Sequence, residues 1–126
     1  MGDVEMVGMY REFGDGSASP FLRDSMYALP ELTSSAVADY LESGFRVSAS
    51  PGVEVDVLNG ELLSAPRAHM TDGRFLWRTD LAYYVRKYRV AVAQDLIGVA
   101  LSGANPPLSL TDDQWEAIRR WFDRNP

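Results

Sequence analysis

Hydrophobic and polar positions are most clearly patterned between residues 71 and 88. The dipeptide at 72–73, Asp-Gly, is typical of a tight turn, and the apolar triplet 75–77 after it predicts a short strand. The next apolar residues recur at the i, i+3, i+4, i+7 spacing of a helix with one buried face: Leu81, Tyr84, Val85 and Tyr88. We therefore predict a helix over 80–88, with Thr79 as its N-cap.

The middle of the chain alternates in the way that half-buried strands do. Over 53–57 three valines alternate with Glu54 and Asp56, which predicts a strand with the valines facing inward and the carboxylates in solvent. The Asn-Gly pair at 59–60 is a strong hairpin signal, and 61–65 would form the return strand. A further strand over 45–49 is expected to end at a turn at Pro51-Gly52, and Pro66 is expected to end the return strand or mark an edge.

Three further helices are predicted on either side of these strands. One spans 33–43, capped at its start by Thr33, Ser34 or Ser35 and ended by Gly44 as a left-handed cap. A second covers about 93–101. The third begins at Thr111, which forms a capping box with Gln114, and its expected buried stripe is Trp115, Ile118 and Phe122.

These elements predict one α+β domain over residues 1–126. Its core would be a small antiparallel β-meander of about four strands, preceded by one helix and followed by three. A chain of 126 residues lies within the usual range for a single domain.

Composition narrows the functional classes. The formal net charge of −6 disfavours nucleic acid and anionic membrane surfaces as partners, and it suits a basic protein. With no cysteine, the chain has no disulfides and no thiolate chemistry. We expect a cytoplasmic protein, since no apolar stretch approaches 18 residues and no signal-peptide pattern is visible. Eleven Arg against one Lys indicate a GC-rich bacterial genome, as in actinobacteria.

No catalytic or metal-binding constellation stands out. His69 is the single histidine, and one histidine with scattered carboxylates is not the pattern of a metal site. Glu54 and Asp56 lie two residues apart and could do acid–base work, but the solvated face of a sheet is the simpler interpretation. We therefore expect no catalytic residues, no metal and no cofactor.

A basic and aromatic segment is the best candidate for a contact surface. Residues 69–90 carry five basic and two acidic residues, whereas residues 1–45 carry two basic and eight acidic ones, so the two segments could also neutralise each other. Tyr, Trp and Arg dominate binding hot spots. The candidate partner-binding residues are Arg74, Arg78, Tyr83, Arg86, Lys87 and Trp121.

The segment 71–88, TDGRFLWRTDLAYYVRKY, resembles a recurring segment of small acidic bacterial proteins with the pattern TDG-x-(W/F)-x-W-x-x-DLAYYV-x-x-Y. Some of these resemble immunity proteins of polymorphic toxin systems. The resemblance implies a protein that binds and blocks a cognate toxin, and it carries over no catalytic residues. Such proteins often continue with a Leu-Pro-x-x-Phe-like segment, where this chain reads VAQDLI at 92–97.

Three functions therefore remain open. The first is a protein-binding domain that blocks a toxin or another protein. The second is an accessory or regulatory protein that self-associates through its aromatic C-terminal helix, with Trp121 exposed. The third is an enzyme built from scattered acidic, basic and His69 side chains, and we place it last.

Overall fold

The computed structural model describes residues 3–14 and 18–125. In chain order its elements are β1 (Glu5–Met6), η1 (Arg11–Phe13), η2 (Arg23–Ser25), α1 (Glu31–Glu42), β2 (Phe45–Val55), β3 (Leu62–Thr71), β4 (Phe75–Arg78), α2 (Leu81–Tyr88), α3 (Gln94–Leu101) and α4 (Asp112–Arg124). The α+β class is confirmed, and three α-helices follow β4 as predicted. The earlier helix, α1, precedes β2 but follows β1, so it does not precede the whole sheet as expected.

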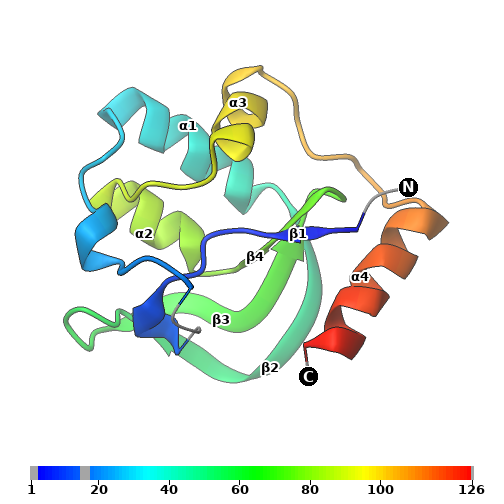
Figure 1. Cartoon of the computed structure of the whole chain (residues 1–126), viewed down its shortest axis with the longest axis horizontal. Coiled ribbons are helices and arrows are strands. Elements are labelled where there is room, and N and C mark those ends of the chain that lie inside the picture. Colours follow the sequence, from blue (N-terminus) through cyan, green and yellow to red (C-terminus); the bar gives the residue numbers. More distant parts are fainter. Residues whose placement is uncertain (1–2, 15–17, 126) are drawn as a thin grey trace.

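The four strands form one mixed sheet in the order β1-β4-β3-β2 (Figure 1). The β2, β3 and β4 strands pair antiparallel, but β1 pairs parallel to β4, so the prediction of a purely antiparallel meander is wrong. Two backbone hydrogen bonds hold β1: from Glu5 N–H to the Arg74 carbonyl at 3.0 Å and from Val7 N–H to the Leu76 carbonyl at 2.9 Å. A two-residue strand is too short to show an alternating pattern.

Side chains of β4 alternate between two hydrophobic clusters. Phe75 and Trp77 belong to the larger cluster, which α1, α2 and α3 complete. Leu76 points the other way and joins Val4 and Ile118 under α4. Figure 1 shows α4 apart from the other three helices, across the sheet from them. Helices therefore cover both faces of the sheet: α1, α2 and α3 lie on one face, and α4 alone lies on the other.

Two helix ends differ from the prediction. The α1 helix begins at Glu31 behind Pro30, earlier than the predicted serine and threonine caps. Its C-cap is Ser43, and Gly44 does not adopt the left-handed conformation. Gly44 instead leaves room for the indole of Trp77, because a methyl group there would come within 2.6 Å of that ring.

The start of α2 also differs. Asp80, not Thr79, is its N-cap residue, and no side chain caps the helix there. The hydroxyl of Thr79 donates instead to the carbonyl of Pro66. That bond joins the end of β4 to β3, so the threonine fastens the sheet instead of the helix.

The β2–β3 hairpin is longer and more irregular than predicted. Pro51-Gly52 lies inside β2 and Pro66 lies inside β3, where Val53 and Pro66 are register partners. Register shifts flank these positions, and a bulge is the setting in which a sheet tolerates proline. The reversal near Asn59-Gly60 is confirmed, with Gly60 at a φ of 77°, although the loop between the strands spans 56–61.

The α4 helix has the predicted capping box, in which Thr111 and Gln114 bond reciprocally. Its predicted buried stripe is partly wrong. Ile118 is buried and Phe122 is half-buried, but Trp115 is 42% exposed. Among the described residues, no helix is both long enough and apolar enough to cross a membrane.

Candidate functional site

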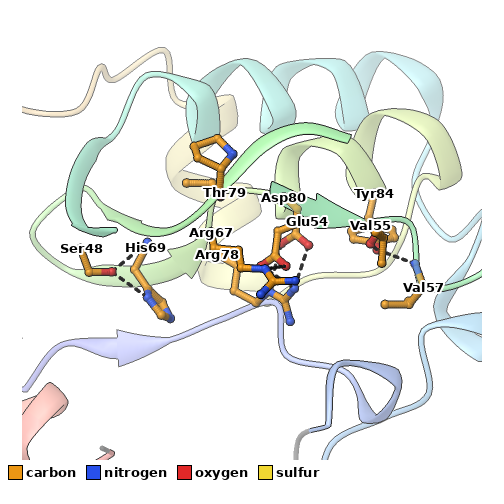
Figure 2. Close-up of polar contacts among 11 residues, drawn as sticks. Ser48, Glu54, Val55, Val57, Arg67, His69, Arg78, Thr79, Asp80 and Tyr84 are labelled. Carbon is orange, nitrogen blue, oxygen red and sulfur yellow. Dashed lines mark hydrogen bonds and ion pairs between the residues drawn. The ribbon is translucent and has the colours of Figure 1, made fainter. Parts of the chain in front are cut away.

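A groove with a mixed polar and apolar lining lies over β2, β3 and the end of β4. Its volume is about 520 Å³. The side chains that matter in its lining are Phe13, Ser48, Glu54, Arg67, His69 and Arg78. Figure 2 shows the polar members, which come from β2, β3 and the end of β4. Three residues singled out in the sequence for possible chemistry, Glu54, His69 and Arg78, therefore meet in one place.

Arg78 is the centre of an ion-pair network. Its Nε and Nη2 donate to the two carboxylate oxygens of Asp80 at 3.0 and 2.9 Å, and Nη2 also donates to Glu54 at 2.9 Å. The guanidinium lies 4.0 Å from the ring centre of Phe13. Because Asp80 is fully buried, desolvation raises the pKa of its carboxyl group, and the charge of Arg78 opposes that rise.

Arg67 extends the network to the surface. Its Nε is 3.7 Å from Glu54, and its side chain is 56% exposed against 16% for Arg78. Since Arg78 already pairs with two carboxylates, Arg67 is the cation of the groove that an approaching ligand would meet. The four charges of Glu54, Arg67, Arg78 and Asp80 balance, so the groove as a whole has little net charge.

Ser48 and His69 form a hydrogen-bonded pair at the other end of the groove. Ser48 Oγ accepts from the backbone N–H of His69 at 3.1 Å, and it lies 2.9 Å from His69 Nδ1. His69 is half-buried, with its ring 5.3 Å from the ring centre of Phe122 and 6.0 Å from that of Trp121. Burial, and then the charge of Arg78, lower the pKa of His69, so the neutral imidazole is favoured.

In nucleophilic sites a neutral histidine can activate a neighbouring serine. Within the part of the chain that the structure describes, the Ser48–His69 pair lacks the carboxylate that usually orients such a histidine. Among the described residues, no carboxylate hydrogen-bonds His69, and no group of three or more potential ligands could hold a metal ion. A catalytic triad uses that carboxylate to orient the imidazole. The contacts of the groove have a structural role instead: through Arg78, they join Glu54 of the hairpin to Asp80 at the start of α2.

A tyrosine cluster fixes the far end of the same hairpin. Tyr83 and Tyr88 both donate to one carboxylate oxygen of Asp56, at 2.6 and 2.7 Å. Burial favours the neutral form of Asp56, but these bonds and the N–H of Leu58 outweigh it and lower the pKa of Asp56. Burial and then Asp56 raise the pKa of Tyr83 and of Tyr88, each to about 12.

The predicted orientation of residues 53–57 is therefore wrong at most positions. Asp56 is fully buried and Glu54 is half-buried, while Val53 and Val55 are 40% and 38% exposed. Alternation shows which residues share a face, but not which face is buried. Here the tyrosine hydroxyls and Arg78 satisfy the carboxylates, so the acidic positions turn inward.

The predicted contact residues do not come together on one surface. Arg78 is within the groove, Arg74 pairs with Asp95 at 3.4 Å, and Trp121 packs on His69. On α2, Arg86 pairs with Asp39 at 3.0 Å and with Glu42, which links the basic segment to the acidic N-terminal third. Tyr83 is half-buried on Asp56. Lys87 is exposed and lies 3.1 Å from the Tyr83 hydroxyl.

Sequence reasoning missed the contributions of Ser48, Asp80 and Tyr88 to these clusters. Ser48 and His69 are far apart in the chain, and only their pairing across β2 and β3 joins them. In the sequence, Asp80 is only the first residue of the predicted helix, and nothing local marks it as the partner of Arg78. Tyr88 was expected on the buried stripe of its helix, and no local signal identifies it as a partner of Asp56.

No protein-family model, no curated protein and no solved structure matches this chain.

Proposed function

We propose that the protein is a protein-binding domain that blocks its partner, as immunity proteins do, and that the far half of the β2–β3 hairpin is its contact surface. The observation that carries this proposal is an exposed aliphatic patch on a rigidly held hairpin. We define the hairpin patch as Val53, Val55 and Leu62, which are 40%, 38% and 77% exposed.

The three residues of the hairpin patch are neighbours. Val55 and Leu62 are register partners across β2 and β3, and Val53 lies two residues before Val55 on the same strand. An exposed apolar cluster rimmed by polar side chains is a common mark of a protein-binding surface. Pro66, the register partner of Val53, is half-buried and extends the apolar surface along β3.

The hairpin patch is also held in place with many polar contacts. Tyr84 Oη donates to the carbonyl of Val55 at 3.1 Å and accepts from the N–H of Val57 at 3.0 Å. Arg78 holds Glu54, and the tyrosine pair holds Asp56. A patch that is ordered before binding loses less entropy on association than a mobile loop. This rigidity supports a contact role for the hairpin.

The charge of the chain indicates the kind of partner. A net charge of −6 attracts a basic protein and speeds its encounter at low salt. Glu61, next to Leu62, is exposed and adds negative charge beside the hairpin patch. A basic toxin is the partner that best fits both the charge and the resemblance of segment 71–88.

The test is affinity capture of the tagged protein from native lysate at low and high salt, with identification of the captured proteins by mass spectrometry. We expect one stoichiometric basic protein whose recovery falls with salt. Leu62→Ser should reduce its recovery strongly. Leu32→Ser is the matched control, because Leu32 is 86% exposed on α1 and lies outside the hairpin patch.

Two results would contradict this proposal. One is the absence of any stoichiometric partner. The other is a loss of recovery that is equal for Leu62→Ser and Leu32→Ser, which would show that general surface hydrophobicity, and not the hairpin, binds the partner.

Self-association is a second candidate, and the exposure of Trp115 on α4 is the observation that favours it. The residue first expected to mediate it, Trp121, is half-buried on His69. Sedimentation at high protein concentration would separate the two proposals. A dimer that Trp115→Ser dissociates would support self-association, whereas a monomer at every concentration would contradict it.

A further inference from the structure

A second cavity, of about 360 Å³, lies between the start of α1 and the end of α2. Tyr27, Glu31, Ser35, Arg86, Lys87 and Arg89 contribute to its lining. None of these residues belongs to the hairpin patch, so an inference about this cavity does not rest on the proposed function.

Arg89 is the unusual member of this lining. It is half-buried, and no carboxylate lies within ion-pair distance of it in the described part of the chain. The two other described arginines without an ion pair, Arg11 and Arg46, are exposed to water. Partly desolvated charges are ordinarily paired. The guanidinium of Arg89 lies over the ring of Tyr27, at 5.5 Å from the ring centre.

The backbone of the cavity wall is held in an uncommon conformation. Tyr27 and Arg89 have φ values of 57° and 48°, and they are the two non-glycine residues with positive φ in the described ranges. Backbone hydrogen bonds fix both: from Tyr27 N–H to the Tyr88 carbonyl at 2.7 Å, and from Ala28 N–H to the Arg89 carbonyl at 3.0 Å. The left-handed φ of Arg89 is that of the C-cap of α2, where its N–H donates to the carbonyl of Val85, so the helix end itself fixes the backbone of Arg89 in the cavity wall.

The other cations of the cavity differ in how much charge they can offer. Arg86 is already engaged with Asp39 and Glu42. Lys87 is exposed and has no ion pair among the described residues. Its ammonium donates to the Tyr83 hydroxyl at 3.1 Å and lies over the rings of Tyr83 and Tyr88, so it adds a second charge to the cavity by exchanging these contacts for a ligand. Glu31 is the opposing group, because its carboxylate lines the same cavity. The cavity thus has one guanidinium and one ammonium available and one competing acid.

We propose that this cavity binds an oxyanion, the phosphate or carboxylate group of a small solute, with Arg89 as its main ligand and Lys87 as a second one. A guanidinium donates two parallel hydrogen bonds to such a group, and charge-assisted bonds of this kind are the strong ones. Tyr27 and Ser35 also line the cavity, and their hydroxyls are neutral donors. The volume suits a small ligand.

The experiment is an NMR titration of the full chain with inorganic phosphate and, separately, with acetate, each compared with sodium chloride at equal ionic strength. We expect saturable shifts confined to residues 27–35 and 86–89 for at least one of the two anions. The anion that binds more tightly identifies the ligand as a phosphate or a carboxylate. Shifts that do not saturate, or that chloride reproduces, would overturn the proposal.

Three variants make the test specific. Arg89→Gln should weaken binding about tenfold or more, since it removes a charge-assisted hydrogen bond. Glu31→Gln should tighten binding, because it removes the competing anion. Arg46→Gln removes the same charge from an exposed site on β2 and should change the affinity less than about twofold.

If Arg89→Gln does not fold, Lys87→Gln replaces it as the test variant, because Lys87 is exposed and its substitution should leave the fold intact. Lys87→Gln should weaken anion binding severalfold. An equal effect of Arg46→Gln and of the cavity variants would show a general charge effect and overturn the proposal. An unchanged affinity in both Arg89→Gln and Lys87→Gln would also overturn it.

Discussion

Tyr40 on α1 donates a hydrogen bond of 2.5 Å to the carboxylate of Asp72 in the β3–β4 turn. Both side chains are buried. Asp72 also accepts from the N–H groups of Arg74 and Phe75, at 3.0 and 2.8 Å, so one carboxylate shapes the turn and ties it to a helix. Burial, and then the bond to Asp72, raise the pKa of the Tyr40 hydroxyl, which stays a donor over the ordinary pH range.

Removing this bond should destabilise the fold. Tyr40→Phe leaves a buried acceptor with one donor fewer, and we expect it to lower the free energy of unfolding by about 1–3 kcal/mol in urea titrations. Asp72→Ala should cost at least as much, since it also frees two backbone donors. The double variant should cost less than the two single changes added together. Strict additivity would show that the two residues are not coupled.

Two glycines should respond in opposite directions to alanine. Gly44→Ala places a methyl group against the ring of Trp77 and should lower the free energy of unfolding by about 1–3 kcal/mol. Gly98→Ala, in α3, meets no atom within 4 Å and should raise it by about 0.5–1 kcal/mol. Thermal unfolding of the two variants measures both. A neutral Gly44→Ala would show that Trp77 can shift to make room.

The two arginines of the groove should differ sharply in their contribution to stability. Arg78→Ala leaves the buried Asp80 without its cation and should lower the free energy of unfolding by about 3–5 kcal/mol. Arg67→Ala breaks an exposed pair with Glu54 and should cost less than about 1 kcal/mol. Denaturant unfolding at neutral pH compares them. Similar losses for both would mean that Asp80 is not dependent on Arg78.

His69 should make stability depend on pH in a defined window. Its pKa in the folded protein lies below the ordinary value of 6.5, so the unfolded chain binds the proton first as the pH falls. The stability that neutral His69 contributes is therefore complete above pH 6.5 and is lost as the pH falls through the lower pKa of the folded state.

The measurement is the free energy of unfolding at about pH 7.5 and about pH 5.5, in the protein and in His69→Gln. The variant should lose less stability between these two values. Asp80, whose pKa is raised, contributes with the opposite sign in both proteins, so the comparison isolates His69. A fall in stability that is the same in His69→Gln would contradict the assignment.

The helices were predictable because their signals are local. The stripe from Leu81 to Tyr88 and the capping box from Thr111 to Gln114 need only neighbouring residues, and both are present. The strand faces were not predictable in the same way. Whether Val55 or Asp56 turns inward depends on tyrosines of α2 that lie 27 or more residues later in the chain.

The candidate site was even harder to predict from the sequence. Glu54, His69 and Arg78 could be named as residues of interest, but their meeting in one groove follows from strand pairing and from the bulges around Pro66. The exposure of Val53 and Val55 reverses the orientation expected from their alternation with Glu54 and Asp56. Likewise, nothing local shows that Arg89 has no carboxylate partner among the residues that the structure describes.

The parallel pairing of β1 with β4 has a consequence for how this molecule is made. Glu5 is the partner of Phe75, seventy residues further along the chain. During synthesis β1 therefore remains without its strand partner until α1, the whole hairpin and β4 have followed. Contacts between such distant residues slow folding. The pairing of β1 with β4 is therefore among the last contacts that can form, although β1 itself is synthesised early.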